Sequence, residues 1–203
     1  MAFRECHNLK TFRLNANIRE LGWFCFWKAG IMKLDLPPYA MITREYLGLD
    51  QHLKMLCLPR GLEAVGDFWF YRSDIEKVFI PNTVKELGKS VFGYCEKMCE
   101  VVFEPDSHLE TIGDNCFSNC VLREIVIPKS VRSIGDAAFR ECLNLRSLTF
   151  EEGSQLAHVG KRVIFGTSLI REKVKFPNIE MHSDEETSFF NFSLSTWTYD
   201  EEL

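Results

Sequence analysis

The chain has 203 residues, of which 46% are hydrophobic and 26% are charged, and its formal net charge is -5. This balance is too apolar for a disordered chain and too evenly charged for a polyelectrolyte. An acidic net charge without a dense block of Lys and Arg argues against a dedicated binder of nucleic acid or anionic membranes. We therefore expect no nucleic-acid partner.

The N-terminal region does not have the pattern of an export signal. Residues 1–10 carry charges where a secretory signal needs an unbroken apolar core. The most apolar stretch, Leu21 to Met32, contains Lys28 and is shorter than the ~20 residues of a membrane-spanning helix. We expect no membrane span. The sequence favours a cytoplasmic chain or a fragment, and leaves the localisation unassigned.

A repeated unit organises the sequence. Residues 2–9 and 138–145 differ at one position in eight. The unit contains a glycine that follows an apolar residue and, in five copies, precedes a Phe by four positions. Successive glycines are 22 or 25 residues apart, except where a degenerate copy carries Arg44 instead. The glycines are Gly22, Gly66, Gly88, Gly113, Gly135 and Gly160, and the Phe residues are Phe26, Phe70, Phe92, Phe117 and Phe139.

Each unit ends in a triplet whose first and third residues are apolar. Alternation of this kind, rich in β-branched and aromatic residues, predicts a short β-strand. One unit buries too little apolar surface to offset its conformational entropy, so the units must stack. Stacked strands form a parallel sheet along one side of a solenoid. The eight triplets are Phe12–Leu14, Leu34–Leu36, Leu56–Leu58, Val78–Ile80, Val101–Phe103, Ile125–Ile127, Leu148–Phe150 and Val174–Phe176.

The copies between Asn82 and Phe150 follow the pattern I-x-x-I-G-x-x-A-F-x-x-C-x-x-L-x-x-I-x-I-P almost position for position. With this pattern the sequence resembles the BspA-like leucine-rich repeat family. The resemblance implies an α/β repeat solenoid of leucine-rich-repeat type, with about eight coils, one parallel β-sheet on one side and few or short helices. It also implies a protein-binding module of surface-antigen type, associated with adhesion to host or matrix proteins and with surface or secreted localisation.

The repeats divide the chain into two parts. We expect a solenoid over residues 1–177, starting in the middle of a repeat, and an irregular cap or acidic tail over residues 178–203. The first coil lacks the polar cap that solenoid ends need, which predicts a fragment of a longer array or end-to-end self-association through this coil. In the tail, Phe190, Phe192 and Leu194 alternate, so a terminal capping strand is the alternative to an acidic tail.

The cysteine positions favour packing over chemistry. Cys6, Cys95, Cys120 and Cys142 share one repeat position, so we expect them to line up inside the coils as small buried hydrophobes. Two C-x3-C pairs suggest zinc, but stacked positions spread the sulfur atoms along the axis, whereas zinc needs thiolates that converge. We expect no metal and no cofactor, and disulfides only in an oxidising compartment.

The middle residues of the triplets point outward and are the candidate partner-binding residues. The central four are apolar and those at the ends are polar or charged, which indicates an apolar patch that binds a protein. Phe79 is the expected anchor because aromatic residues dominate binding hot spots. The candidate set is Arg13, Asp35, Cys57, Phe79, Val102, Val126, Thr149 and Lys175.

Two other functions are alternatives to this one. An intracellular scaffold for protein assembly would use the same kind of surface. A thiol-dependent hydrolase would use Cys57 with the nearby His52, but no Gly-rich elbow or second histidine accompanies them in the sequence. We therefore expect a non-enzymatic protein.

Overall fold

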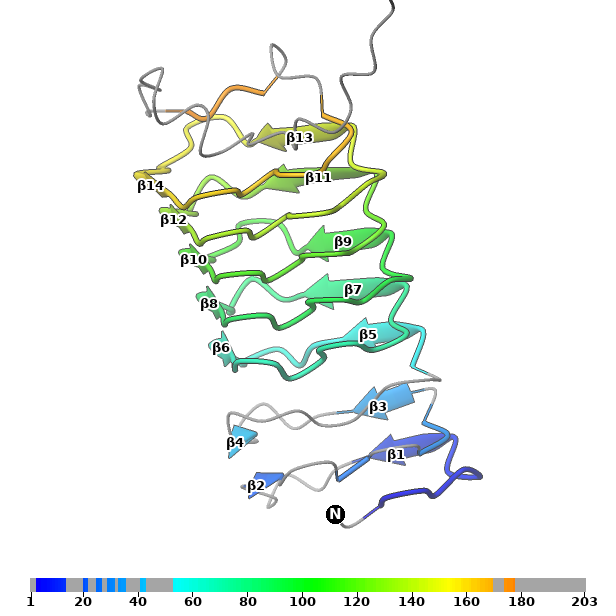
Figure 1. The fold of residues 1–203 in the computed structure, drawn as a ribbon. Helices are drawn as coiled ribbons and strands as arrows, with labels where there is room; N and C mark the ends of the chain where they lie inside the picture. The colour runs from blue at the N-terminus through cyan, green and yellow to red at the C-terminus, as the bar shows by residue number, and fades with distance from the viewer. Residues whose placement is uncertain are drawn as a thin grey trace, which may run out of the picture.

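The coils of the chain stack along one axis (Figure 1). A computed structural model describes residues 3–13, 20–21, 25–26, 29–31, 33–35, 41–42, 53–169 and 174–177. Five consecutive coils, each with one long and one short strand, lie within residues 53–169. These described ranges contain no helix. The leucine-rich-repeat solenoid predicted from the sequence is confirmed.

The long strands form one side of the solenoid and pair in parallel. In β11, for example, Ile125 and Ile127 are buried, whereas Val126 between them is exposed. The eighth predicted triplet, Val174–Phe176, is described but is not a strand. The long strands are β1 (Thr11–Arg13), β3 (Lys33–Asp35), β5 (Met55–Cys57), β7 (Lys77–Ile80), β9 (Glu100–Phe103), β11 (Glu124–Ile127) and β13 (Ser147–Phe150).

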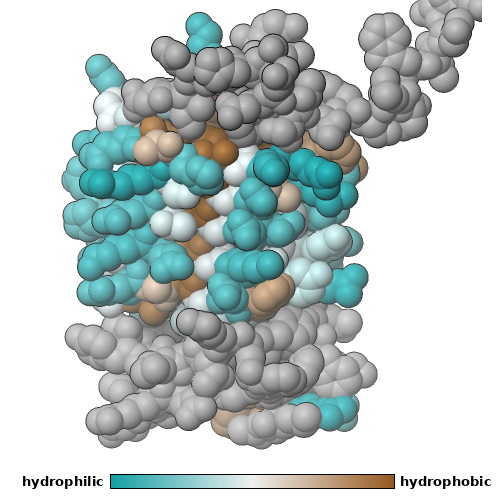
Figure 2. All heavy atoms as spheres, turned by 60° about the vertical axis from the view of Figure 1, so that its left-hand side comes forward, coloured by the Kyte–Doolittle hydropathy of each residue, from teal (hydrophilic) through white to brown (hydrophobic). Residues whose placement is uncertain are grey.

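A second series of parallel strands, each two residues long, lies on another side of the solenoid. The sequence predicted only the first side, because two residues are too few to show an alternating pattern. Figure 2 shows this part of the surface as largely hydrophilic on either side of a narrow apolar stripe along the axis. The short strands are β2 (Glu20–Leu21), β4 (Met41–Ile42), β6 (Ala64–Val65), β8 (Glu86–Leu87), β10 (Thr111–Ile112), β12 (Ser133–Ile134) and β14 (His158–Val159).

The repeated glycine follows each described short strand from β6 onward and lets neighbouring coils approach closely. The backbone N–H of Gly113 donates to the carbonyl of Leu87 at 2.8 Å. A Cβ atom on Gly113 would lie 2.7 Å from the carbonyl carbon of Gly88, far inside van der Waals contact. The glycine in this position is therefore required by the distance between coils rather than by its φ angle.

The third side of each coil is a run of turns that is also hydrogen-bonded to the next coil. Asn115 and Asn119 adopt positive φ angles of 52° and 57°, which asparagine tolerates better than most residues. Their N–H groups donate to the carbonyls of Asp136 and Arg140, each at 2.8 Å. The N–H of Asp136 donates to Oδ1 of Asp114 at 2.8 Å. All three sides thus carry hydrogen bonds between coils.

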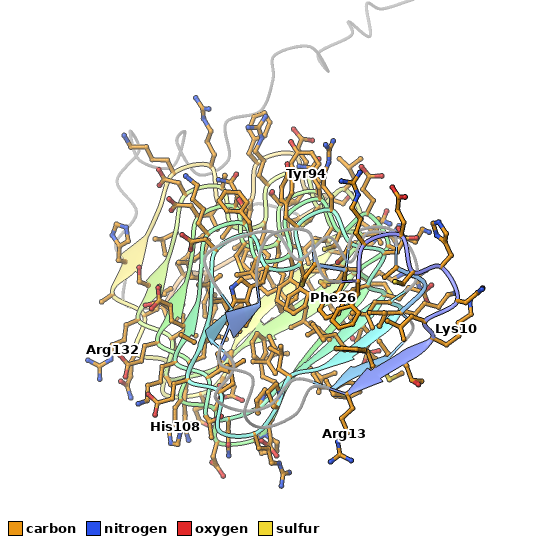
Figure 3. The ribbon with its side chains drawn as sticks, turned by 90° about the horizontal axis from the view of Figure 1, so that it is seen from below. Lys10, Arg13, Phe26, Tyr94, His108 and Arg132 are labelled. Atoms are coloured by element: carbon orange, nitrogen blue, oxygen red, sulfur yellow. The ribbon has the colours of Figure 1, made fainter. Side chains whose placement is uncertain are left out.

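The core is a row of phenylalanines along the axis. Phe70, Phe92, Phe117 and Phe139 are fully buried, and consecutive rings are stacked with centroids 5.5–5.6 Å apart. Phe26, from the same repeat position, lies in the interior when the solenoid is viewed along its axis (Figure 3). The predicted alignment of this repeat position inside the coils is confirmed.

Truncation of one ring should destabilise the whole stack. Phe117→Ala removes a ring that is stacked on both faces, so we expect a loss of about 3–5 kcal/mol in the free energy of unfolding. Denaturant titration measures this loss. Phe165→Ala is the control, because Phe165 is only half-buried and should cost much less. Equal losses in the two variants would contradict the central role of the row.

Candidate protein-binding surface

The candidate column follows the outer face of the long strands. Strand register places Cys57 beside Phe79 and Phe79 beside Val102, and places Val126 beside Thr149. Arg13 pairs with Asp35 between β1 and β3, and the side chain of Asp35 lies outside the described residues. The exposed members are Arg13, Cys57, Val126, Thr149 and Lys175, while Phe79 and Val102 are half-buried.

Val126 is more accessible than the other aliphatic and aromatic residues of the described column, Phe79 and Val102. Its exposed fraction is 53%. Phe79, the anchor expected from the sequence, is partly covered by Lys77, whose Nζ lies 4.8 Å from the ring centroid. The same Nζ donates to Oε1 of Glu100 at 2.5 Å. The apolar part of the surface therefore extends from Phe79 toward Val126 rather than centring on Phe79.

The sheet of long strands is interrupted between β9 and β11. Strands β5, β7 and β9 form one hydrogen-bonded sheet and β11 and β13 form another. The short strands β8, β10 and β12 remain paired across the same two coils. The interruption thus affects one side of the solenoid only.

A change of coil length explains the interruption. The repeat from Gly88 to Gly113 spans 25 residues and the next, to Gly135, spans 22. As a result, β9 begins five residues after Cys95, whereas β11 begins four residues after Cys120. Where a short unit precedes a long one, as for β7 and β9, the strands pair normally. Among the long strands within residues 53–169, the break occurs where this order is reversed.

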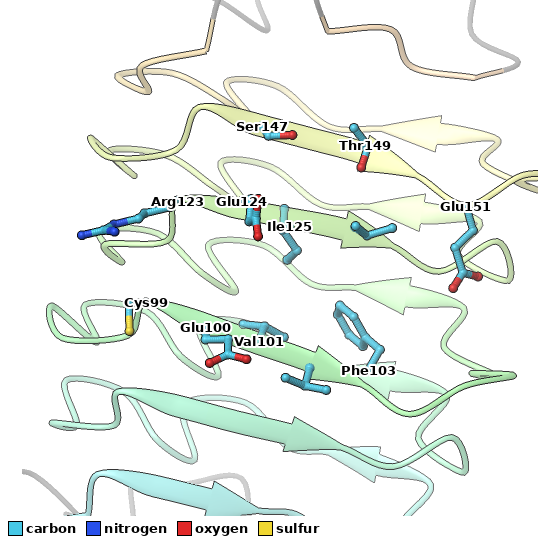
Figure 4. A pocket seen from close by; sticks show the side chains of 12 residues that line it. Cys99, Glu100, Val101, Phe103, Arg123, Glu124, Ile125, Ser147, Thr149 and Glu151 are labelled. Carbon is cyan, nitrogen blue, oxygen red and sulfur yellow. The ribbon is translucent and has the colours of Figure 1, made fainter.

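A groove of about 930 Å³ lies at the interruption (Figure 4). Val101 and Phe103 of β9 are half-buried there, whereas their counterparts Val78 and Ile80 in β7 are fully buried. The break thus exposes side chains that elsewhere belong to the core. The lining residues are Cys99, Glu100, Val101, Val102, Phe103, Arg123, Glu124, Ile125, Val126, Ser147, Thr149 and Glu151.

The groove brings together three of the predicted residues, Val102, Val126 and Thr149. Sequence reasoning did not identify the other lining residues, because Val101 and Phe103 have the pattern of core residues. The signal that could have found them is the change from a 25-residue to a 22-residue spacing.

The charges at the groove are mainly negative. Glu100, Glu124 and Glu151 line it together with a single cation, Arg123. Glu100 is paired with Lys77, and Oε2 of Glu151 accepts a hydrogen bond from the backbone N–H of Lys129 at 2.9 Å. The groove therefore combines an apolar floor with an acidic rim.

Most cysteines of the repeat position are buried in the coils, as predicted. The thiols of Cys95, Cys120 and Cys142 donate to the carbonyls of the Phe residues one coil earlier, at 3.1–3.3 Å. Burial raises the pKa of Cys95 and of Cys142 from 9.0 to about 12. Cys116 lies outside this repeat position but is also buried, and burial raises its pKa well above 9.0.

Cys6 is exposed, and for this residue the prediction of a buried position was wrong. Each buried thiol is covered by an earlier coil, whereas Cys6 lies in the first coil that the structure describes. Cys57 is exposed on the sheet, and its suggested partner His52 lies outside the described residues. All eight cysteines are free thiols. Across the residues described, no group of three or more His, Cys, Asp or Glu side chains could hold a metal ion.

The buried thiols should make stability fall at alkaline pH. Below a pH of about 9 the thiols are neutral in both the folded and the unfolded chain. Above this pH they ionise in the unfolded chain but stay protonated in the folded chain. The free energy of unfolding therefore falls from pH 9 toward pH 12. Each thiol contributes a slope of about 1.4 kcal/mol per pH unit in this window. Urea unfolding at pH 7.5 and pH 10 measures it. The double variant Cys95→Ala/Cys142→Ala should show a shallower decline, and an unchanged decline would refute this assignment.

The chain belongs to the family described as the BspA type leucine rich repeat region, whose model matches residues 1–99 and 110–203 in 6 copies. No curated protein matches the chain. The described residues include no apolar helix of membrane-spanning length.

Solved structures share the fold. A leucine-rich repeat protein from Bacteroides ovatus is 25% identical to this chain, with a TM-score of 0.65. The match covers 83% of this chain and 44% of the Bacteroides ovatus chain. The pneumococcal vaccine antigen PcpA is 24% identical with a TM-score of 0.52, covering 60% of this chain and 34% of its own. A leucine-rich repeat protein from Eubacterium ventriosum is 12% identical with a TM-score of 0.50, covering 82% of this chain and 55% of its own. The chain thus spans less than two thirds of the length of each.

Proposed function

We propose that the chain is a non-enzymatic protein-binding solenoid whose partner docks on the outer face of the long strands. The observation that carries this proposal is the apolar surface that the half-buried Val102 and the exposed Val126 form at the groove. Stacked coils give such a surface a fixed and extended shape, which is how repeat proteins bind partners. Exposed apolar groups within a polar rim are the usual composition of a binding surface.

Adhesion to host or matrix proteins is the specific form of binding that we propose first. Its support is membership of the BspA-type family, together with the likeness of the fold to the pneumococcal vaccine antigen PcpA. An intracellular assembly scaffold is the second candidate. It is favoured by the coil cysteines, because Cys95, Cys120 and Cys142 use their S–H groups as hydrogen-bond donors and so fit a reducing compartment.

Two substitutions of the same kind test the binding face. Val126→Asp should weaken partner capture at least tenfold, because it places a charge in the middle of the apolar surface. Leu143→Asp is the control: Leu143 is 63% exposed but does not line the groove. The double variant Phe79→Asp/Val126→Asp should abolish capture.

The immobilised chain is offered purified extracellular-matrix proteins in one arm and a lysate of its own cells in the other, which separates adhesion from scaffolding. Denaturant titration verifies that both single variants keep their stability within about 0.5 kcal/mol. If Val126→Asp captured the partner as well as the native chain, or if Leu143→Asp lost it equally, the long-strand face would not be the binding site.

A further inference from the structure

We propose that the groove between β9 and β11 binds a short segment of the partner protein in which apolar side chains alternate with Lys or Arg. This inference rests on the proposed function and identifies the chemistry of the partner. Figure 4 shows the groove running along the two strands, with Glu100 and Val101 on one side and Glu124 and Ile125 on the other.

The apolar floor of the groove favours apolar side chains in the partner segment. Val101 and Phe103 occupy positions whose counterparts in β7 are fully buried, and here they remain half-buried beside Val102. The exposed side chain of Val126 borders the same space. Apolar side chains of a partner would therefore cover surface that the other coils remove from water with their own residues.

The interrupted ladder favours an extended segment. Strands β9 and β11 are not paired with each other. Because the groove runs along both strands (Figure 4), an extended segment lying over it would turn every second side chain toward the apolar floor.

The acidic rim of the groove favours Lys or Arg in the partner segment. Glu100, Glu124 and Glu151 line the groove together with one cation, Arg123. Glu100 is paired with Lys77, and the remaining Glu124 and Glu151 outnumber Arg123, so the lining keeps a net negative charge. Lys or Arg in the partner complements this rim and provides both selectivity and faster association. An acidic segment would meet like charges along the same path.

The test measures how far a bound peptide protects one thiol of the native chain. Cys99 lines the groove and is exposed, whereas Cys57 is exposed on β5, outside the groove. The probes are two synthetic eight-residue peptides, one alternating Val with Lys and the other alternating Val with Glu. Iodoacetamide labelling of each cysteine is followed by mass spectrometry at increasing peptide concentration.

We expect the Val-Lys peptide to slow the labelling of Cys99 about tenfold at ten times its dissociation constant. The labelling of Cys57 should not change, and the Val-Glu peptide should protect neither thiol. Equal protection by the two peptides, equal protection of the two thiols, or no protection of Cys99 would each overturn the proposal.

Charge reversal at one position provides a second readout. Glu124→Lys should abolish protection by the Val-Lys peptide, whereas Glu96→Lys, at an exposed turn residue outside the groove, should leave it intact. Protection that survives Glu124→Lys would contradict the acidic rim.

Failure of this inference can be told from failure of the proposed function. If Val126→Asp loses its partner but Cys99 is never protected, the long-strand face binds a protein of different chemistry and only the groove proposal is wrong. If Val126→Asp keeps its partner, the proposed function fails whatever the peptides do.

Discussion

The constraint on which the structure depends is that each coil must stay in phase with its neighbours. Hydrogen bonds join the coils on three sides, and the stacked rings of Phe70, Phe92, Phe117 and Phe139 fill the space between them. A single coil has no core of its own, so each position is stable only because the same position recurs one coil away. The close approach at Gly113 follows from the same requirement.

The candidate site forms where two successive coils differ in length and their long strands are no longer paired. Coils of different length can remain paired on two sides while they separate on the third, and this occurs between β9 and β11. The half-buried Val101 and Phe103 are the result. The groove is therefore made from ordinary repeat residues, and it needs no inserted loop or additional domain.

The repeat pattern was sufficient to predict the coils, the row of Phe rings and the burial of three of the four repeat-position cysteines, because each repeat position has one environment throughout the stack. It failed for Cys6, whose environment depends on a coil before it rather than on its repeat position. It did not reveal the short strands, which are too brief for a periodic signal. The groove was missed because it depends on a difference between two successive units, not on the sequence of either.

The one-sided break also has a mechanical consequence. The short strands β10 and β12 stay paired, and Phe92 remains stacked on Phe117, across the two coils whose long strands are separated. These contacts hold the two coils together on the short-strand side and in the core. On the long-strand side, β9 and β11 lack the strand pairing that would resist separation of the coils. A bending force on the solenoid is therefore concentrated at this seam, and the curvature of the whole array changes there before it changes at any intact junction between coils.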